Sequence, residues 1–404
     1  MSTSLLYHAF GVRGYTHQRT SFDQGVVVFH TRSSRAALAC SVCGGDRFTL
    51  AGVVPRRFKT LPIGGKAVFL DIPVQRLFCH ACGKTLQARL HFADPKRTYT
   101  HAFERYALEL STHMTIKAVA EHLRVGWDIL KDIQLRHLKR HFGRPPLWGL
   151  RHIAIDEISI GRGHRYLTVV LDLESGAVVF VGEGRGADAL IPFWKRLKRS
   201  RAKIHAVATD MSPAYIKAVH ENLPDAVHVF DRFHVIKLYN EQLAELRREV
   251  QRSVETAGER KLLKGTLWLL MKNSENLNEE KNERAKLELA LQINQPPACA
   301  YYMKEELRQL WRQRDKKAAE KFLNSWCRRA DESGVKRLKR FANTLRLHRT
   351  GLLNWYRCAI STGPLEGTNT KIRVMQRQGY GYRDQEFFRL KIYAIHLSSY
   401  ALVG

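Results

Sequence analysis

The sequence predicts a multidomain α+β protein. Two C-x-x-C-G motifs lie in a segment with short strand-forming runs and turn signals, which favours a metal-binding, β-rich module at the N-terminus. Residues 152–230 read in the order β-β-β-α-β-α-β, which differs from the regular βαβ alternation of a doubly wound fold. A helical, basic stretch follows at 237–350 and has almost no strand-forming composition. At 404 residues the chain is long enough for several such domains.

The charge of the chain points to a polyanionic partner. The formal net charge is +29, from 67 Lys and Arg against 38 Asp and Glu, and nucleic acid is the commonest partner of so basic a chain. Residues 151–236 are an exception, with 12 basic and 10 acidic residues between two basic flanks. The plainer interpretation is general solubility or unspecific stickiness. No run approaches the ~20 apolar residues of a membrane helix, and the N-terminus has no secretory pattern, so we expect a soluble intracellular protein.

Four of the seven cysteines have the spacing of a structural zinc site. Cys40 and Cys43 form one C-x-x-C-G motif, and Cys79 and Cys82 form the other. Four thiolates make a closed tetrahedral zinc site, and the glycine after each pair allows the backbone to turn around the metal. The gap between the pairs exceeds the usual spacing, and a β-hairpin turning at residues 63–65 (IGG) would accommodate it. A redox pair, or two chance pairs, is the alternative.

Residues 114–142 have the layout of a helix-turn-helix. Ile116, Val119, Ala120 and Leu123 give the first helix an apolar face, a turn follows at Val125-Gly126, and a second apolar pattern begins at Trp127. The second helix could lie in a major groove of DNA. Its basic residues are the candidate contacts to phosphates or bases, namely Lys131, Arg136, Lys139 and Arg140. An ordinary αα-hairpin is the alternative interpretation.

The middle of the chain predicts a mixed sheet with two helices. The expected elements are strands at 152–157, 166–172, 177–181, 205–209 and 226–230, with helices at 187–199 and 213–222. Asp156 ends the first of these strands, and Asp210 ends the fourth. Two neighbouring strands that end in Asp bring their carboxylates together, which would repel one another without a cation. With Mg²⁺ or Mn²⁺ they become hard oxygen ligands.

A third carboxylate is expected from a later helix. Glu366 lies in GPLEGTNTKIR, where Ser361 or Thr362 can cap a helix, and Asn369 and Arg373 fall on the same helical face. We therefore predict a site for two divalent ions formed by Asp156, Asp210 and Glu366. Taken singly, each acid is more ordinarily a helix cap or a loop acid, and a cap is a real competitor for Asp210.

Two further motifs have weaker signals. DRFH places Asp231 and His234 after the last strand of the sheet, where they could position substrate or support a ligand, although a histidine satisfied within the fold is as good an explanation. Residues 379–384 (GYGYRD) could stack on bases or could simply pack in a turn.

Together these motifs resemble transposases of the ISL-three family of bacterial insertion sequences. The phrases AIDEISIGRGHRYLTVV, DMSPAY, VFDRFHV and GPLEGTN are similar to that family's core blocks, and the likeness extends from about residue 38 to 400. The resemblance implies a ribonuclease-H-like (retroviral-integrase-like) catalytic core interrupted by an all-α insertion. It also implies a DDE triad of Asp156, Asp210 and Glu366, with Arg373 as the basic residue seven positions later.

The resemblance also implies five segments and a location. These are a zinc-binding module at 1–95, a helix-turn-helix domain at 96–145, the ribonuclease-H-like core at 150–236 and 351–404, and a helical insertion at 237–350. The zinc-binding module and the helix-turn-helix would bind double-stranded DNA at the terminal inverted repeats, and the insertion would hold flanking or target DNA. A bacterial cytoplasmic protein associated with the nucleoid, dimeric or larger on DNA, is the implied setting.

The implied reaction is metal-dependent strand cleavage followed by strand transfer. Two other classes of function remain open. A catalytically silent DNA-binding regulator would not need its acids, and a structure-specific ribonuclease-H-like nuclease would cut without joining. The inverted-repeat sequence, the target preference and the fate of the second strand are not encoded in any recognisable pattern.

Overall fold

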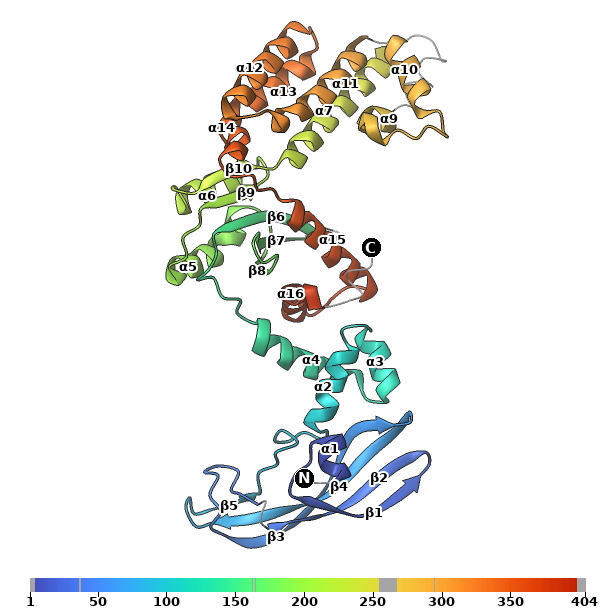
Figure 1. Cartoon of the computed structure of the whole chain (residues 1–404), viewed down its shortest axis with the longest axis vertical. Coiled ribbons are helices and arrows are strands. Elements are labelled where there is room, and N and C mark those ends of the chain that lie inside the picture. Colours follow the sequence, from blue (N-terminus) through green and yellow to red (C-terminus); the bar gives the residue numbers. More distant parts are fainter. Residues whose placement is uncertain are drawn as a thin grey trace. The chain divides into compact units, whose positions relative to one another are not determined.

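The computed structural model describes residues 4–35, 38–161, 163, 165–253, 267–293 and 295–397. Parts of the expected N-terminal module, helical insertion and C-terminal core segment lie outside these residues. The chain divides into two compact units, one of residues 1–143 with 375–404 and the other of residues 144–374 (Figure 1). None of the described helices is both long enough and apolar enough to cross a membrane.

A twisted five-stranded sheet begins the first unit. Its strands are β1 (Tyr15–Asp23), β2 (Val26–Ser33), β3 (Phe48–Ile63), β4 (Lys66–Cys79) and β5 (Lys84–Gln87), in the order β1-β2-β4-β3 with β5 also on β4. Helix α1 (Leu5–Phe10) packs against its apolar core. The long β3–β4 hairpin turns at Gly64-Gly65 between Ile63 and Lys66, so the expected hairpin between the two cysteine pairs is confirmed.

Three short helices form the helix-turn-helix. They are α2 (His101–Leu110), α3 (Ile116–Leu123) and α4 (Trp127–Phe142). Thr100 and Thr115 cap α2 and α3 by accepting the backbone N–H of Phe103 and Ala118. The expected apolar face of α3 is confirmed, because Val119, Ala120 and Leu123 are buried. The expectation for Trp127 is wrong, since its side chain is 51% exposed.

The C-terminal helix α16 (Gln385–Tyr393) packs on α4. Phe387 and Leu390 of α16 cluster with Leu138 of α4. Asp384 caps α16 by accepting the backbone N–H of Phe387. The last described part of the chain therefore joins the helix-turn-helix within the first unit; it ends in the short turn η6 (Ile395–Leu397).

A five-stranded mixed sheet organises the second unit. Its strands are β6 (His152–Gly161), β7 (Arg165–Asp172), β8 (Val178–Glu183), β9 (Ala206–Thr209) and β10 (Val227–Phe230). Their order is β10-β9-β6-β7-β8, with β6, β7 and β8 antiparallel and β9 and β10 parallel to β6. One face is covered by η2 (Ala187–Leu190), α5 (Ile191–Ser200) and α6 (Pro213–Asn222), whose buried side chains pack on Ile153 and Ile155. The expected β-β-β-α-β-α-β order is confirmed.

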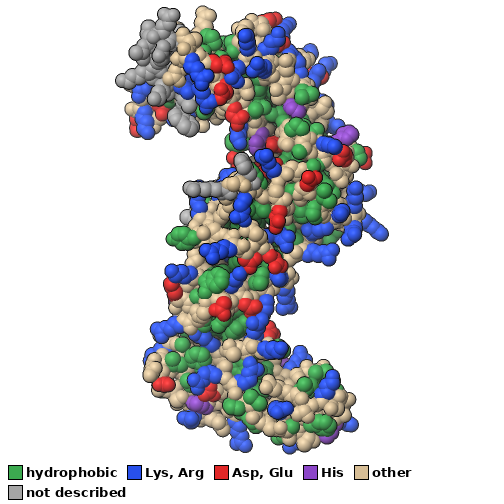
Figure 2. All heavy atoms as spheres, turned by 180° about the vertical axis from the view of Figure 1, so that it is seen from behind, with side chains coloured by type: hydrophobic (Ala, Val, Ile, Leu, Met, Phe, Trp, Pro, Cys, Tyr) green, Lys and Arg blue, Asp and Glu red, His purple; other side chains and the backbone are tan. Residues whose placement is uncertain are grey.

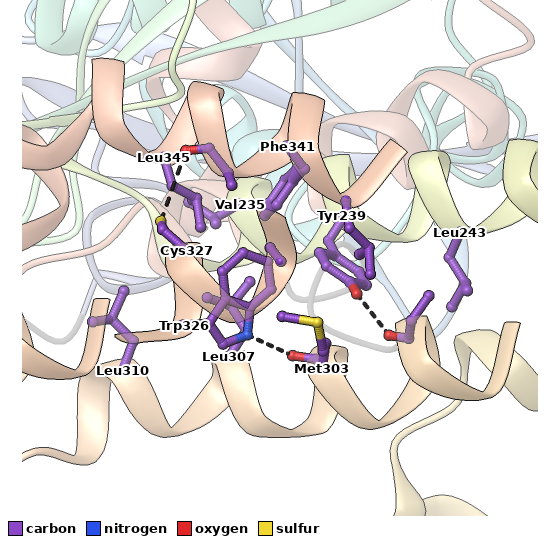
Figure 3. Packing of buried hydrophobic residues seen from close by; sticks show 14 of the residues in the cluster. Val235, Tyr239, Leu243, Met303, Leu307, Leu310, Trp326, Cys327, Phe341 and Leu345 are labelled. Atoms are coloured by element: carbon purple, nitrogen blue, oxygen red, sulfur yellow. Dashed lines mark hydrogen bonds between the residues drawn. The ribbon is translucent and has the colours of Figure 1, made fainter. Parts of the chain in front are cut away.

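The expected helical insertion follows β10. It contains α7 (Arg232–Ser253), α9 (Leu267–Met271), η3 (Ser274–Asn276), α10 (Glu283–Ile293), α11 (Gln295–Leu307), η4 (Arg308–Arg312), α12 (Lys316–Glu332), α13 (Lys336–Leu347), α14 (Arg349–Leu353) and η5 (Asn354–Tyr356). Trp326, Tyr239 and Phe341 form its aromatic centre (Figure 3). The two polar groups of this centre donate to backbone carbonyls, Trp326 Nε1 to Met303 at 2.9 Å and Tyr239 Oη to Ala300 at 2.6 Å (Figure 3).

Helix α15 (Gly363–Gln378) follows the insertion and runs beside the β6 sheet (Figure 1). Leu365, Ile372 and Met375 are its buried apolar residues. Glu366 and Arg373 are exposed on it, whereas Asn369 is only 2% exposed. The fold as a whole is a zinc-binding β-rich module, a helix-turn-helix and a ribonuclease-H-like core interrupted by an all-α insertion, as expected.

Candidate catalytic centre, zinc site and DNA-binding residues

The four predicted zinc ligands meet at one end of the first sheet. Cys40 and Cys43 lie in a turn before β3, Cys79 ends β4, and Cys82 lies in the turn to β5. Their sulfur atoms all lie within 4.8 Å of one another, with 3.7 Å between Cys40 and Cys82 and 3.5 Å between Cys43 and Cys79. Ligands at 2.3 Å in a tetrahedron lie about 3.8 Å apart, so the four thiols fit a zinc ion.

The backbone around the cysteines suits thiolates. Gly44 and Gly83 follow the two pairs with φ of 74° and 64°, the left-handed region that glycine enters without strain. Backbone N–H groups of Cys43 and Val42 lower the pKa of Cys40 to about 6. Burial and the neighbouring thiols raise the pKa of Cys82 to about 11, so four thiolates cannot coexist here without a cation. Both observations favour a structural zinc ion.

Three of the four predicted DNA contacts on α4 have acidic partners inside the protein. Lys131 Nζ lies 2.8 Å from Asp384, and Lys139 Nζ lies 3.0 Å from Glu386. Arg136 has more partners than either lysine: its guanidinium bonds the Tyr99 hydroxyl and lies within ion-pair distance of Asp94, Glu104 and Asp132. Arg140 is exposed. On the face drawn in Figure 2, Lys and Arg occur along the whole length of the view.

The pairing of β6 with β9 brings Asp156 and Asp210 together. The two strands are parallel and pair up to Ala154 with Ala208. Each aspartate lies two residues beyond that pair, which is the same face and the same level of the sheet. The expectation that Asp156 ends its strand is wrong. Strand β6 continues to Gly161 in antiparallel pairing with β7. What ends beside Asp156 is the pairing with β9.

The charge of Asp156 is poorly accommodated in this place. Burial raises its pKa, and the nearby negative charges of Asp210 and Glu157 add to the effect, although the Glu157 backbone N–H and the His234 charge oppose it. Glu157 itself points to the other face, where its Oε1 accepts the Tyr215 hydroxyl at 2.9 Å. Asp156, and not Glu157, is therefore the acid that faces Asp210.

Helix α15 contacts this pair of acids through Asn369. Its amide Nδ2 donates to Asp156 Oδ2 at 2.9 Å, while its Oδ1 is buried and has no hydrogen-bond donor among the described residues. An orphaned amide oxygen beside two carboxylates suits a divalent cation. Glu366 lies three residues earlier on the same helix and is exposed. Within the described residues, the cysteine group is the one set of three or more potential ligands that closes within 4.8 Å. The carboxylate of Glu366 does not complete such a set.

The DRFH motif also lies at this site. Asp231 is 2% exposed and its carboxylate joins the start of α7 to the turn before α15. Its Oδ2 accepts the backbone N–H of Phe233 and lies 3.4 Å from His234 Nδ1, and its Oδ1 accepts the N–H of Thr362. Burial lowers the pKa of His234, but the bond to Asp231 and the charges of Asp156, Asp231 and Asp210 outweigh it and raise the pKa. The DRFH motif therefore places a histidine whose protonated form is favoured beside the two acids.

Some of the supporting contacts had no signal in the sequence. The Thr209 hydroxyl bonds His228 Nε2 at 2.7 Å and the carbonyl of Asp210 at 2.6 Å, directly behind the second aspartate. Asn354 Nδ2 donates to the carbonyl of His228 at 2.9 Å. These residues are single polar side chains in apolar surroundings, and no local pattern distinguishes them from other loop or strand residues.

The chain matches three family models. Residues 37–82 match a model described as zinc-finger of transposase IS204/IS1001/IS1096/IS1165. Residues 88–138 match one described as helix-turn-helix domain of transposase family ISL3, and residues 153–392 match a DDE-type model of the same family described as transposase. The three matched segments follow one another along the chain.

Relatives match over nearly the full length. The transposase for insertion sequence element IS1001 of Bordetella parapertussis is 31% identical over 390 residues, covering 95% of this chain and 96% of its own. The transposase for insertion sequence element IS1557 of Mycobacterium tuberculosis is 29% identical, covering 90% and 87%. A chain of the Drosophila P element transposase strand transfer complex aligns at a TM-score of 0.36 and 12% identity, covering 73% of this chain and 91% of that one.

The TM-score of 0.36 is too low to indicate a common fold. The family models match along the chain and the bacterial relatives match over at least 87% of their own length, so the predicted resemblance to the ISL-three transposases is confirmed. The chain belongs to the ISL3 (ISL-three) family, and it is a transposase of the DDE type.

Proposed function

We propose that this transposase binds the terminal inverted repeats of its insertion sequence, cleaves a DNA strand at the element's end and joins that end to target DNA. Asp156, Asp210 and Glu366 are the proposed catalytic carboxylates. The observation that carries this proposal is the parallel register of β6 and β9, which puts Asp156 and Asp210 at one level on one face. The Asn369 contact brings α15 to the same place, with Glu366 one turn earlier.

The carboxylates and Asn369 Oδ1 form a set of oxygen donors that fits Mg²⁺ or Mn²⁺. Two such ions, when bound, would lower the pKa of the attacking water or 3′-hydroxyl and stabilise charge on the scissile phosphate. Asp156 and Asp210 supply oxygens from the sheet, and Glu366 supplies one from α15, where its side chain is exposed. Arg373, exposed two turns further along α15, is placed to pair with a phosphate.

Two reactions at phosphorus follow from this arrangement. In cleavage, the oxygen of a water molecule bonds to the scissile phosphorus, the bond to the 3′-oxygen breaks, and that oxygen leaves as a 3′-hydroxyl. In strand transfer, this 3′-hydroxyl bonds to a phosphorus of the target and displaces the 3′-oxygen of the target strand. Asp231 keeps the acids aligned throughout, since it holds the turn before α15 to the start of α7.

The remaining segments are proposed to hold DNA. The zinc-binding module (1–95) and the helix-turn-helix (96–145) bind the inverted repeats, with Arg140 exposed for contact and Lys131, Arg136 and Lys139 exchanging acidic partners for phosphates. The helical insertion (237–350), which separates the core segments 150–236 and 351–404 in the sequence, holds flanking or target DNA. Action at two ends of an element calls for at least a dimer, working in the bacterial cytoplasm at the nucleoid.

The deciding experiment compares wild type with Asp156→Asn and Glu366→Gln on labelled inverted-repeat DNA with Mg²⁺. We expect both variants to bind the DNA and neither to cleave it. Glu157→Gln is the matched control, because it changes the adjacent acid on the opposite face and should cleave normally. Variants that lose binding and fold poorly would instead mark the acids as structural.

A pre-cleaved end with a free 3′-hydroxyl separates the alternatives. Joined product from wild type supports strand transfer. Cleavage without joining would identify a nuclease, and binding with neither reaction would identify a regulator.

A further inference from the structure

Helix α5 carries a concentration of positive charge that the catalytic proposal does not use. Six of the 12 basic residues of the segment 151–236 fall within 195–203 (KRLKRSRAK), and no acid occurs from 189 to 209. The ten acids that balance this charge lie in other parts of the same segment, at 156–188 and 210–231. The positive charge of this segment is therefore concentrated in one stretch of the chain.

The structure exposes most of this charge. Phe193, Trp194 and Leu197 face the sheet and are buried, which turns Lys195, Lys198 and Arg199 to solvent. Arg201, at the left-handed end of the helix, and Lys203 are exposed beside them. The sixth residue, Arg196, is partly buried and donates to the carbonyl of Pro145 at 2.7 Å. We call the five exposed residues (Lys195, Lys198, Arg199, Arg201 and Lys203) the α5 patch.

No member of the α5 patch has an acidic partner within the part of the chain that the structure describes. On the neighbouring helix α6, Lys217 lies 3.8 Å from Glu221. The helix dipole favours cations in the last turn of α5, but it does not account for Lys195, nor for Arg201 and Lys203 beyond the helix. Five like charges this close repel one another unless an anion lies against them.

The α5 patch lies on the face of the sheet opposite the candidate catalytic centre. Helix α5 packs on the face of Ile153 and Ile155, whereas Asp156 alternates to the other face and meets Asn369 there. DNA held at Asp156 cannot touch α5 at the same point. Any DNA on the α5 patch is therefore a different stretch from the one being cut.

We infer that the α5 patch binds the phosphate backbone of duplex DNA, at a stretch separate from the scissile one and without base specificity. The inference rests on the proposed action on DNA. A duplex is the partner that fits, because it offers one negative charge per ~1.7 Å of axis, a density that can match five cations between residues 195 and 203. The patch consists of Lys and Arg, which contact phosphate oxygens and can also read guanine, and it has no Asn, Gln or acid with which to read adenine or cytosine.

The test uses the full chain with the triple variant Lys195→Ala, Lys198→Ala and Arg199→Ala. Dissociation constants are measured from low to moderate salt, on inverted-repeat DNA and on an unrelated duplex. Each lost phosphate contact should reduce the log–log salt slope by about 0.9, so the triple variant should lose up to ~2.7, equally on both duplexes. Lys198→Gln alone should lose about 0.9, and its control, Lys217→Gln on α6, should retain a larger share of the wild-type slope.

Two outcomes would overturn the inference. A triple variant that folds normally, by its thermal midpoint, and keeps the wild-type slope would show a solvated surface only. A loss confined to inverted-repeat DNA would show base reading instead of backbone contact. The catalytic proposal is judged separately: at saturating protein the triple variant should still cleave the bound end, whereas Asp156→Asn should keep the full salt slope and not cleave.

Discussion

Asp156 is a single residue whose proposed role in catalysis lowers the stability of the fold. Its carboxylate is partly buried, faces Asp210, and receives a side-chain hydrogen bond from Asn369 at 2.9 Å. A buried carboxylate next to another is destabilising when ionised, and functional sites commonly retain such groups at the expense of stability. The residue proposed for catalysis is thus one whose ionised form destabilises the fold.

This cost has a definite pH dependence. The pKa of Asp156 is higher in the folded protein than in the unfolded chain, so the folded state holds the proton more firmly. The residue therefore destabilises the fold above its folded pKa, and the penalty fades as the pH falls through that value to the unfolded one. Without added divalent metal, Asp156→Asn should unfold at a higher temperature than wild type at pH 7. The gain should shrink as the pH falls towards 4.

Thermal unfolding followed by circular dichroism measures this difference. Glu157→Gln, with its side chain on the opposite face beside Tyr215, is the control and should show no comparable gain. An Asp156→Asn variant that is less stable than wild type at neutral pH would contradict the electrostatic argument.

At the scale of elements, the β3–β4 hairpin connects the metal site to the DNA-binding helices. Cys79 ends β4 at the zinc end of the hairpin. Further along β3, the Lys59 ammonium donates to the carbonyls of Leu123 and Arg124 at the end of α3. These carbonyls have no partner within the helix, so Lys59 caps it. Order at the zinc end of the hairpin should therefore support the helix-turn-helix.

Removal of one zinc ligand tests this connection. Cys79→Ser should lower the bound zinc from about one per chain to well below one, as measured by elemental analysis, and should weaken binding to inverted-repeat DNA. Cys358→Ser changes a partly buried cysteine outside the site and should keep both. Full zinc content in the Cys79 variant would exclude this residue as a required ligand.

The sequence predicts elements better than it predicts their ends or their contacts. Apolar runs located the strands of the core. In the first sheet, the apolar run AVFLDI (67–72) marks only part of the 14 residues of β4, because pairing with β3 extends that strand through polar positions. Asp156 lies within a strand for the same reason. The three acids could be named from motifs alone. The bond from Thr362 to Asp231 joins residues 131 positions apart, and no local pattern encodes such a contact.

At the scale of the whole molecule, the helical insertion leaves and rejoins the core at one place. Phe230 ends β10 at the start of the insertion, and α14, near its end, packs against β10. Asn354 bonds the carbonyl of His228 in the same strand. A Cβ atom at Gly351 would overlap the ring of Phe230. The ring at one junction therefore packs directly against the backbone at the other.

Gly351→Ala should accordingly destabilise the protein by about 1–3 kcal/mol, since overpacking forces a shift of the ring or the backbone. Chemical denaturation gives the change in the free energy of unfolding. Gly149→Ala is the control, because a Cβ there meets open space. Equal stability of the two variants would mean that the junction is looser than its packing indicates.

This meeting of the two junctions has an evolutionary consequence. A cassette that begins and ends at one point can grow, shrink or be exchanged by recombination while the strands and helix around it keep their places. The number of residues that separates Asp210 from Glu366 can then drift freely among relatives, and the distance between their α-carbons need not change.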